Sequence, residues 1–249
     1  MASSGARPAP ILLAESVTAG YGGAPVITDV TVQVAASEVV SVVGPNGSGK
    51  STLLKSLVGV IRVMSGSVTL KNRAITNWAT EDVARAGVGY VPQVDDVFGP
   101  LSVRENLEMG GYLLPQREVP ARVEHVVGVF PALGRMLTRR AEKLSGGERK
   151  MLAMGRVLML QPALFVLDEP TANLAPAIAH TLLHDHIQRL ATTGAGVLLV
   201  EQRARSALAI SSWTYVMGGG QCRTEGSSAE LSGRADFVES FLGGAPAHA

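Results

Sequence analysis

The most informative stretch of this sequence is Gly44-Pro-Asn-Gly-Ser-Gly-Lys-Ser51. It fits the pattern G-x-x-x-x-G-K-[ST], and it stands between a valine-rich run, 38–43, and a stretch with helical periodicity, 51–60. Glycines in such a loop let successive backbone N–H groups and the N-terminus of the following helix point at phosphate oxygens. A chance glycine-rich turn is the alternative, and the strand before and helix after the loop argue against it. The pattern predicts a nucleotide-phosphate site.

The residues of this phosphate loop, 44–51, have separate expected roles. Lys50 is expected to reach the β and γ phosphates, and the hydroxyl of Ser51 is expected to ligate Mg²⁺. ATP and Mg²⁺ are therefore the expected cofactors. The residues expected to bind the nucleotide here are Gly44, Pro45, Asn46, Gly47, Ser48, Gly49, Lys50, Ser51 and Thr52.

A second apolar run, 164–167, ends in two carboxylates, Asp168 and Glu169. A strand buried on both faces ends at the carboxyl edge of its sheet, where ligands of parallel sheets bind. Alone, such an acidic pair is often only a cap after a strand. Beside the phosphate loop, Asp168 is expected to hold Mg²⁺ directly or through water. Glu169 is expected to orient or deprotonate the water that attacks the γ phosphate.

A third motif, Leu-Ser-Gly-Gly-Glu at 144–148, precedes an expected helix at 149–160. Ser145 is a favourable N-cap residue, and Gly146 and Gly147 leave N–H groups free at the positive end of that helix. Two interpretations stay open at this point: a plain helix start, or a second anion site.

The rest of the chain alternates between strand and helix patterns, which indicates an α/β fold around a parallel sheet. We expect a parallel-sheet core with an N-terminal antiparallel β subdomain, and a helical subdomain inserted at about residues 100–160. The expected domain is 11–242, with frayed tails at 1–10 and 243–249. The segments behind this reading are half-buried strands at 11–17 and 29–34, buried strands at 38–43, 164–167 and 197–200, and helices at 51–60, 175–191 and 203–210.

Composition narrows the function classes. Of the 249 residues, 46% are hydrophobic and 17% charged, which excludes disorder along the whole length. The net charge of +1 gives no excess field for nucleic acid, which is not an expected partner. A single cysteine, Cys222, excludes an intrachain disulfide and is typical of a reducing cytosol. We find no apolar run of membrane-spanning length and no signal peptide at the N-terminus, so any membrane role is expected to come through a partner.

Four segments stand in the order and rough spacing of the ATPase subunits of ABC transporters, which the chain resembles over about 11–242. They are the phosphate loop, Tyr90-Val-Pro-Gln93, the 144–148 segment and Leu167-Asp-Glu-Pro170. A finer resemblance is to the second ATPase of branched-chain amino acid importers. The strings that carry it are Ala19-Gly-Tyr-Gly22, Ala84-Arg-Ala-Gly-Val-Gly-Tyr-Val-Pro-Gln93, Leu101-Ser-Val-Arg-Glu-Asn-Leu107 and Leu199-Val-Glu-Gln202.

The resemblance implies that two subunits close head to tail over two ATP molecules, so that Ser145, Gly146 and Gly147 bind the γ phosphate held by the partner. It implies that Tyr21 stacks on adenine, although a packed core residue is the alternative for this tyrosine. Gln93 would touch metal or water and move with the helical subdomain. Gln202 would lie near the γ phosphate, where most such ATPases carry histidine.

Two further positions depart from the family pattern. Val94-Asp-Asp-Val97 replaces a segment that is commonly basic and contains glycine, in a region expected to face the membrane partner. In Thr171-Ala-Asn-Leu-Ala175, Asn173 stands where the subunit-contact loop usually carries glycine before the leucine.

We therefore expect an ATP-hydrolysing subunit of an ABC importer for branched-chain or related small amino acids or amides, bound peripherally at the cytoplasmic face of the membrane. Its expected partners are a second ABC ATPase subunit, as a heterodimer or a homodimer, two transmembrane permease subunits and, indirectly, a solute-binding protein. One alternative is a weakly hydrolysing clamp that completes a partner's site. Another, an ABC ATPase acting on DNA or ribosomes, lacks support because the chain has neither a long coiled-coil insertion nor an excess of basic residues.

Overall fold

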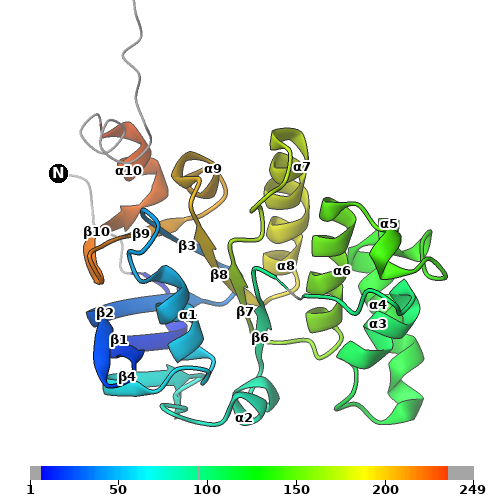
Figure 1. Ribbon diagram of the computed structural model, residues 1–249, viewed down its shortest axis with the longest axis horizontal. Coiled ribbons are helices and arrows are strands. Elements are labelled where there is room, and N and C mark those ends of the chain that lie inside the picture. Colours follow the sequence, from blue (N-terminus) through cyan, green and yellow to red (C-terminus); the bar gives the residue numbers. More distant parts are fainter. Residues whose placement is uncertain (1–6, 95, 235–249) are drawn as a thin grey trace, which may run out of the picture.

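Two β-sheets and a set of helices make up the computed structural model, which describes residues 7–94 and 96–234 (Figure 1). The strands are β1 Pro10–Tyr21, β2 Ala24–Ala35, β3 Val39–Val43, β4 Val63–Leu70, β5 Arg73–Ala74, β6 Val88–Val91, β7 Leu164–Asp168, β8 Gly196–Glu201, β9 Trp213–Gly218 and β10 Gln221–Ser227. The helices are α1 Lys50–Leu57, α2 Thr80–Arg85, α3 Val103–Gly110, η1 Gln116–Glu118, α4 Val119–Val129, α5 Pro131–Gly134, η2 Ala141–Lys143, α6 Gly146–Leu158, α7 Pro176–Thr181, η3 Leu182–Ile187, α8 Gln188–Thr192, α9 Ala204–Leu208 and α10 Ser228–Gly233.

The central sheet has the order β10-β9-β3-β8-β7-β6, and only the β10–β9 pair is antiparallel. Its middle strands are apolar on both faces because a separate core covers each face. In β3, Val39 and Val43 join one core, and Val40 and Val42 join the other. This confirms the expected parallel-sheet core and the three buried strands that the apolar runs predicted.

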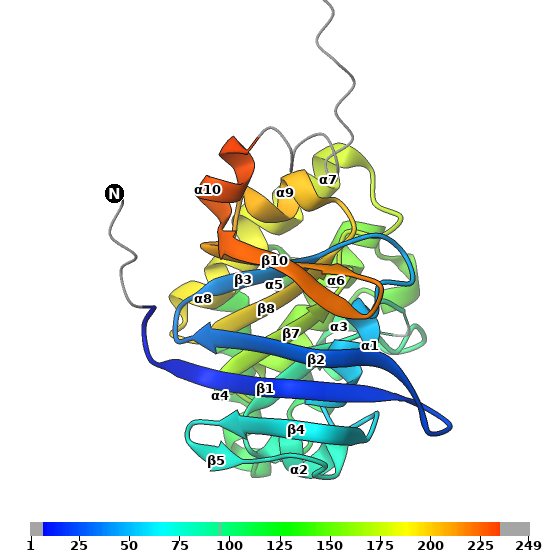
Figure 2. The same ribbon diagram turned by 90° about the vertical axis from the view of Figure 1, so that its left-hand side faces the viewer.

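An antiparallel sheet of order β2-β1-β4-β5 forms a second layer (Figure 2). Its buried side shares a core with α1 and one face of the central sheet: Ile27 of β2, Leu53 of α1 and Val42 of β3 belong to the same apolar cluster. The alternation at 11–17 and 29–34 thus predicted β1 and β2 correctly, because each strand buries only one face.

A helical subdomain, α3 to α6, lies beside the other face of the central sheet (Figure 1). Phe130, Leu107 and Met154 from this subdomain are buried together in a core that continues to the sheet. Proline opens elements here as its missing N–H allows: Pro120 is in the first turn of α4, and Pro131 begins α5. The α3–α6 segment falls within the stretch of about 100–160 that the sequence indicated.

Some elements differ from the sequence expectation. The single helix expected at 175–191 is α7, a π-helical stretch η3 and α8. Arg7 lies within the expected frayed tail at 1–10, yet its guanidinium donates to Glu38 and to the Tyr215 hydroxyl. Residues 1–6 and the expected tail at 243–249 lie outside the described residues. Within residues 7–94 and 96–234, no helix has both the length and the apolar character needed to cross a membrane.

Candidate nucleotide site

The candidate site lies where the parallel strands of the central sheet end. The phosphate loop follows β3, Asp168 ends β7, and Gln93 and Gln202 come just after β6 and β8. Because neighbouring parallel strands present their carboxyl ends at one edge, four distant parts of the sequence meet there. A cavity of about 380 Å³ at this edge is lined by Val26, Asn46, Gly47, Ser48, Gly49, Lys50, Ser51, Thr52, Gln93 and Glu169.

The glycines of the phosphate loop are required by space as well as by backbone conformation. A Cβ on Gly44 would lie 2.2 Å from the carbonyl oxygen of Met217, and one on Gly49, whose φ is +96°, would lie 2.5 Å from a methyl of Ile27. Within the described residues the buried Ser48 hydroxyl has no hydrogen-bond partner. An unpartnered buried hydroxyl in a glycine-rich loop that leads into a helix N-terminus fits an anion such as the phosphates of ATP.

Lys50 begins α1 and is buried, with 4% exposure. Its ammonium donates to the carbonyl oxygens of Gly44 at 2.9 Å and Pro45 at 3.0 Å, and it lies 3.8 Å from Oε1 of Glu169. Burial lowers the pKa of Lys50, and the nearby carboxylates of Glu169, Asp168 and Glu201 oppose that shift. The cation is thus held inside the loop that would receive the phosphates.

Ser51 and Asp168 form the part of the site suited to a hard cation. The Ser51 hydroxyl donates to Oδ1 of Asp168 at 3.0 Å, and the Tyr90 hydroxyl donates to Oδ2 at 3.4 Å. Burial and the neighbouring Asp168 raise the pKa of Tyr90, which keeps its phenol a donor. Among the described residues no group of three or more His, Cys, Asp or Glu side chains gathers to hold a metal. One carboxylate and one hydroxyl fit Mg²⁺, which takes few protein ligands and completes its shell with water and substrate phosphates.

Glu169 and Gln93 both line the cavity and are in direct contact. Nε2 of Gln93 donates to Oε2 of Glu169 at 2.9 Å. The backbone of Glu169 has φ +44°, a left-handed conformation unusual for a residue with a side chain, and its N–H donates to the Val200 carbonyl. Such strain persists where the surrounding structure fixes the backbone, and it is common at functional sites. The carboxylate is thereby held between Lys50 and Gln93.

Gln202 is exposed and lines a neighbouring cavity of about 330 Å³ together with Gln93 and Thr171. Sequence reasoning gave no role to Glu201 beside it, which is 2% exposed and accepts from the Thr171 N–H at 3.0 Å and hydroxyl at 2.8 Å. Burial raises the pKa of Glu201. Tyr90 was likewise given no role. The sequence did carry a signal for both residues, because each is a polar residue in an otherwise apolar strand: Tyr90 lies within β6, and Glu201 ends β8.

The structure does not bring the remaining candidates into this cavity. Tyr21 ends β1 and is 54% exposed. Ser145 is exposed and caps α6: its Oγ accepts from the Glu148 N–H at 3.4 Å, and Glu148 accepts from the Ser145 N–H at 2.7 Å. The helix-start interpretation of 144–148 is therefore confirmed, while the second anion site stays a prediction.

Packing explains the two glycines of this segment and the departure at Asn173. A Cβ on Gly146 would lie 2.7 Å from Leu174, and one on Gly147 would lie 2.5 Å from Ile178, so both glycines let the loop 169–175 and α7 approach α6. Asn173 has φ +61°. After glycine, asparagine is among the residues that adopt this left-handed conformation most readily, so it replaces the usual glycine at small cost.

Known proteins match this chain along almost its whole length. The ABC transporter family model matches residues 27–172. The probable branched-chain amino acid transport ATP-binding protein LivF of Archaeoglobus fulgidus is 39% identical, over 91% of this chain and 96% of the relative. The high-affinity branched-chain amino acid transport ATP-binding protein BraG of Pseudomonas aeruginosa is 36% identical, over 92% and 98%.

Two other similarities complete the comparison. The lipopolysaccharide export system ATP-binding protein LptB of Acidithiobacillus ferridurans is 34% identical over 89% of this chain and 92% of the relative. A crystal structure of the ADP conformation of an ABC transporter ATP-binding cassette has a TM-score of 0.84 and 28% identity, covering 95% of this chain and all of the other. The phosphate loop, the two carboxylates at the end of β7 and these similarities together establish that the chain belongs to the ABC transporter family of ATP-binding subunits and is an ATPase.

Proposed function

We propose that this chain drives the import of branched-chain amino acids, or of related small amino acids and amides, by hydrolysing ATP at the cytoplasmic face of the membrane. The observation that carries the hydrolytic part is the convergence of Lys50, Asp168 and Glu169 at one sheet edge. The cargo is supported by the names of the two relatives at 39% and 36% identity.

Each residue of the candidate site has a separate role in the proposed hydrolysis of ATP. Lys50 and the backbone N–H groups of the phosphate loop hold the β and γ phosphates. Ser51 and Asp168 would hold Mg²⁺, which when bound would offset the negative charge of the phosphates. Glu169 accepts a proton from the attacking water, and the hydrogen bond from Gln93 fixes the orientation of that carboxylate.

Two ATPase subunits are needed for a complete site. Ser145, Gly146 and Gly147 bind the γ phosphate held by the opposite subunit, and Tyr21 stacks on the adenine bound to its own chain. This arrangement is supported by the exposure of Ser145 and by its absence from the lining of the chain's own cavity. The second subunit is a paired ABC ATPase, in a heterodimer or a homodimer.

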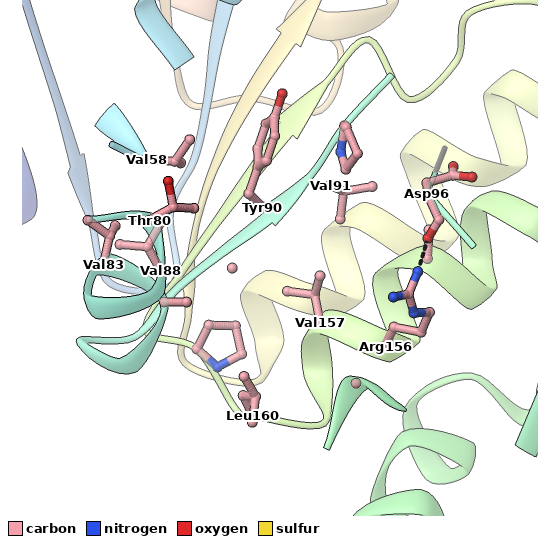
Figure 3. Close-up of a pocket in the computed structure, with 16 residues that line it drawn as sticks. Val58, Thr80, Val83, Val88, Tyr90, Val91, Asp96, Arg156, Val157 and Leu160 are labelled. Atoms are coloured by element: carbon pink, nitrogen blue, oxygen red, sulfur yellow. Dashed lines mark hydrogen bonds between the residues drawn. The ribbon is translucent and has the colours of Figure 1, made fainter. Parts of the chain in front are cut away.

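The two membrane subunits contact a groove of about 380 Å³ beside the nucleotide cavity (Figure 3). Apolar side chains such as Val83 of α2, Val91 of β6 and Val157 of α6 line it. Pro92 also lines the groove and directly precedes Gln93. A movement of the groove lining would therefore be passed to Gln93, whose side chain donates to Glu169. A solute-binding protein delivers the cargo to the outer side of these membrane subunits.

The similarity to lipopolysaccharide export ATPases makes export of a lipid-linked glycan the second candidate. A weakly hydrolysing clamp is not favoured, since both Asp168 and Glu169 are present and in contact with the rest of the site.

Reconstitution separates the two cargoes. The chain, purified with the membrane subunits that bind it, is placed in proteoliposomes containing ATP, and labelled leucine is supplied outside with the solute-binding protein. We expect uptake that needs ATP and is lost in Glu169→Gln. ATPase activity stimulated by lipopolysaccharide, with no leucine uptake, would exclude amino acid import.

A further inference from the structure

Asp96 is a buried charge outside the nucleotide cavity, in the segment where the sequence departs from the family pattern. Its side chain is 5% exposed, and its neighbours are basic residues of α6. Oδ2 lies 2.7 Å from Nζ of Lys150, and Oδ1 lies 4.0 Å from Nε of Arg149. The guanidinium of Arg156 donates to the backbone carbonyl of Asp96 (Figure 3). The segment after Gln93 is thus attached to α6 at several points.

Lys150 contacts both the Asp96 carboxylate and the backbone at Gln93. Its side chain is 10% exposed, and its ammonium donates to the carbonyl oxygens of Gln93 at 2.7 Å and Pro92 at 3.5 Å. The hydrogen bonds of this ammonium go to the two carbonyls, and its contact with the Asp96 carboxylate is an ion pair. Because an unpaired buried charge is strongly unfavourable, removing Asp96 would leave the Lys150 ammonium without its carboxylate partner.

We propose that Asp96 and Lys150 are positioning residues: by holding the backbone of Gln93 to α6, they keep the side-chain amide of Gln93 in contact with Glu169. The chain of contacts has two steps. Lys150, in α6, donates to the backbone of Gln93, and the side chain of Gln93 donates to Glu169 at 2.9 Å. The inference rests on the proposed roles of Gln93 and Glu169 in hydrolysis.

The test uses the full-length chain in its assembled complex, with Asp96→Asn, Lys150→Gln and the double variant. We expect each single variant to lower kcat about tenfold while ATP affinity, measured by equilibrium titration, stays within twofold. The double variant should be no slower than the slower single variant, because both changes break the same contact. Arg104→Gln is the matched control: it removes one positive charge from an exposed ion pair of α3, with Glu108 at 4.0 Å, and it should keep kcat within twofold.

Two results would overturn this inference. One is a lowered melting temperature with unchanged kcat, which would make the pair a purely structural contact. The other is a double variant slowed by the product of the two single effects, which would mean that the residues act independently. If Asp96→Asn does not fold, Asp96→Glu replaces it. That variant keeps the charge and lengthens the side chain, so we expect about a threefold loss of kcat, and wild-type kcat would overturn the proposal.

Glu169→Gln, measured in the same complex, separates this inference from the proposed function. Wild-type turnover in Glu169→Gln would remove the proposed role of Glu169, whatever Asp96 and Lys150 do. Loss of turnover in Glu169→Gln together with wild-type kcat in both pair variants would remove only the role of the pair.

Discussion

Lys50 shows how a single side chain is prepared for its ligand. Its ammonium is buried among backbone carbonyls and faces Glu169 at 3.8 Å, so a bound phosphate would gain a desolvated cation already in position. We expect Lys50→Ala to weaken ATP binding about 10- to 100-fold, the loss typical of a charged hydrogen bond. Equilibrium titration with a fluorescent ATP analogue measures it. Lys55→Ala, on the same helix but outside the cavity lining, is the control, and equal affinities of the two variants would contradict the assignment.

Gln202 follows β8 and lines the cavity next to the nucleotide cavity. A glutamine amide can donate and accept hydrogen bonds but cannot become a cation, so it offers positioning without charge stabilisation. We expect Gln202→His to speed single-turnover hydrolysis in the assembled transporter by a few-fold. An unchanged rate would mean that positioning is most of what this residue supplies.

Asn173 illustrates what the sequence alone leaves open at the level of one residue. Its departure from glycine is visible in the sequence, but the left-handed φ of +61° that accounts for it is a property of the folded loop. The same holds for Glu169. Its position after an apolar run predicted a role for its carboxylate in hydrolysis. Its left-handed backbone and its contact with Gln93 depend on residues far along the chain. The spacing of motifs in the sequence predicts which residues come together in the site. Their backbone conformations and side-chain contacts depend on packing in the folded chain.

At the scale of elements, α6 has two expected tasks at its N-terminal end. Ser145 caps the helix, and we propose that it also receives the partner's γ phosphate. Ser145→Arg should leave ATP binding to the isolated chain intact and block ATP-dependent dimer formation, measured by size-exclusion chromatography with multi-angle light scattering. Ser102→Arg is the matched control, because Ser102 caps α3 with the same reciprocal pair of hydrogen bonds. If both variants dimerise with ATP, the role in trans is wrong.

The end of β8 holds the loop 169–175 through Glu201. Burial raises the pKa of this carboxyl, so folding favours its protonated form, and its contribution to stability is lost as pH rises above the ordinary value of 4.5. In Glu201→Gln, the new amide oxygen would still accept from the Thr171 N–H and hydroxyl, and the side chain would carry no charge. We therefore expect this variant to raise the melting temperature at pH 8 by about 2–4 °C and by less at pH 5. Glu124→Gln, an exposed site on α4, should show no such trend, and a Glu201→Gln protein less stable than wild type at pH 8 would contradict the account.

Elements that bury both faces were the easiest to predict. β3, β7 and β8 are continuous apolar runs because a core lies on each side of them. β4, with its Met-Ser-Gly-Ser interior, and the short β6 carry weaker patterns, and only their pairing with β1 and β7 makes them strands. The π-helical η3 could not be predicted from the sequence, because the helical periodicity of 175–191 continues through it unchanged.

At the scale of the whole molecule, the candidate residues fall into two groups that lie in different places. The central sheet gathers the phosphate loop, Asp168, Glu169 and Gln93 at one edge, whereas Ser145 begins a helix that does not line that cavity. Sequence motifs predicted both groups. We propose that the first group binds ATP within the chain and that the second, around Ser145, contacts the ATP of a partner subunit.

The central claim, that Glu169 activates the attacking water at a site formed by the phosphate loop and Asp168, is tested most directly by Glu169→Gln. The amide keeps the shape of the side chain but cannot accept the proton. Measured as single-turnover hydrolysis of labelled ATP alongside equilibrium ATP binding, the variant should bind ATP with wild-type affinity and convert it about a hundredfold or more slowly, in line with the usual contribution of a general base. Hydrolysis by Glu169→Gln at the wild-type rate would contradict the account.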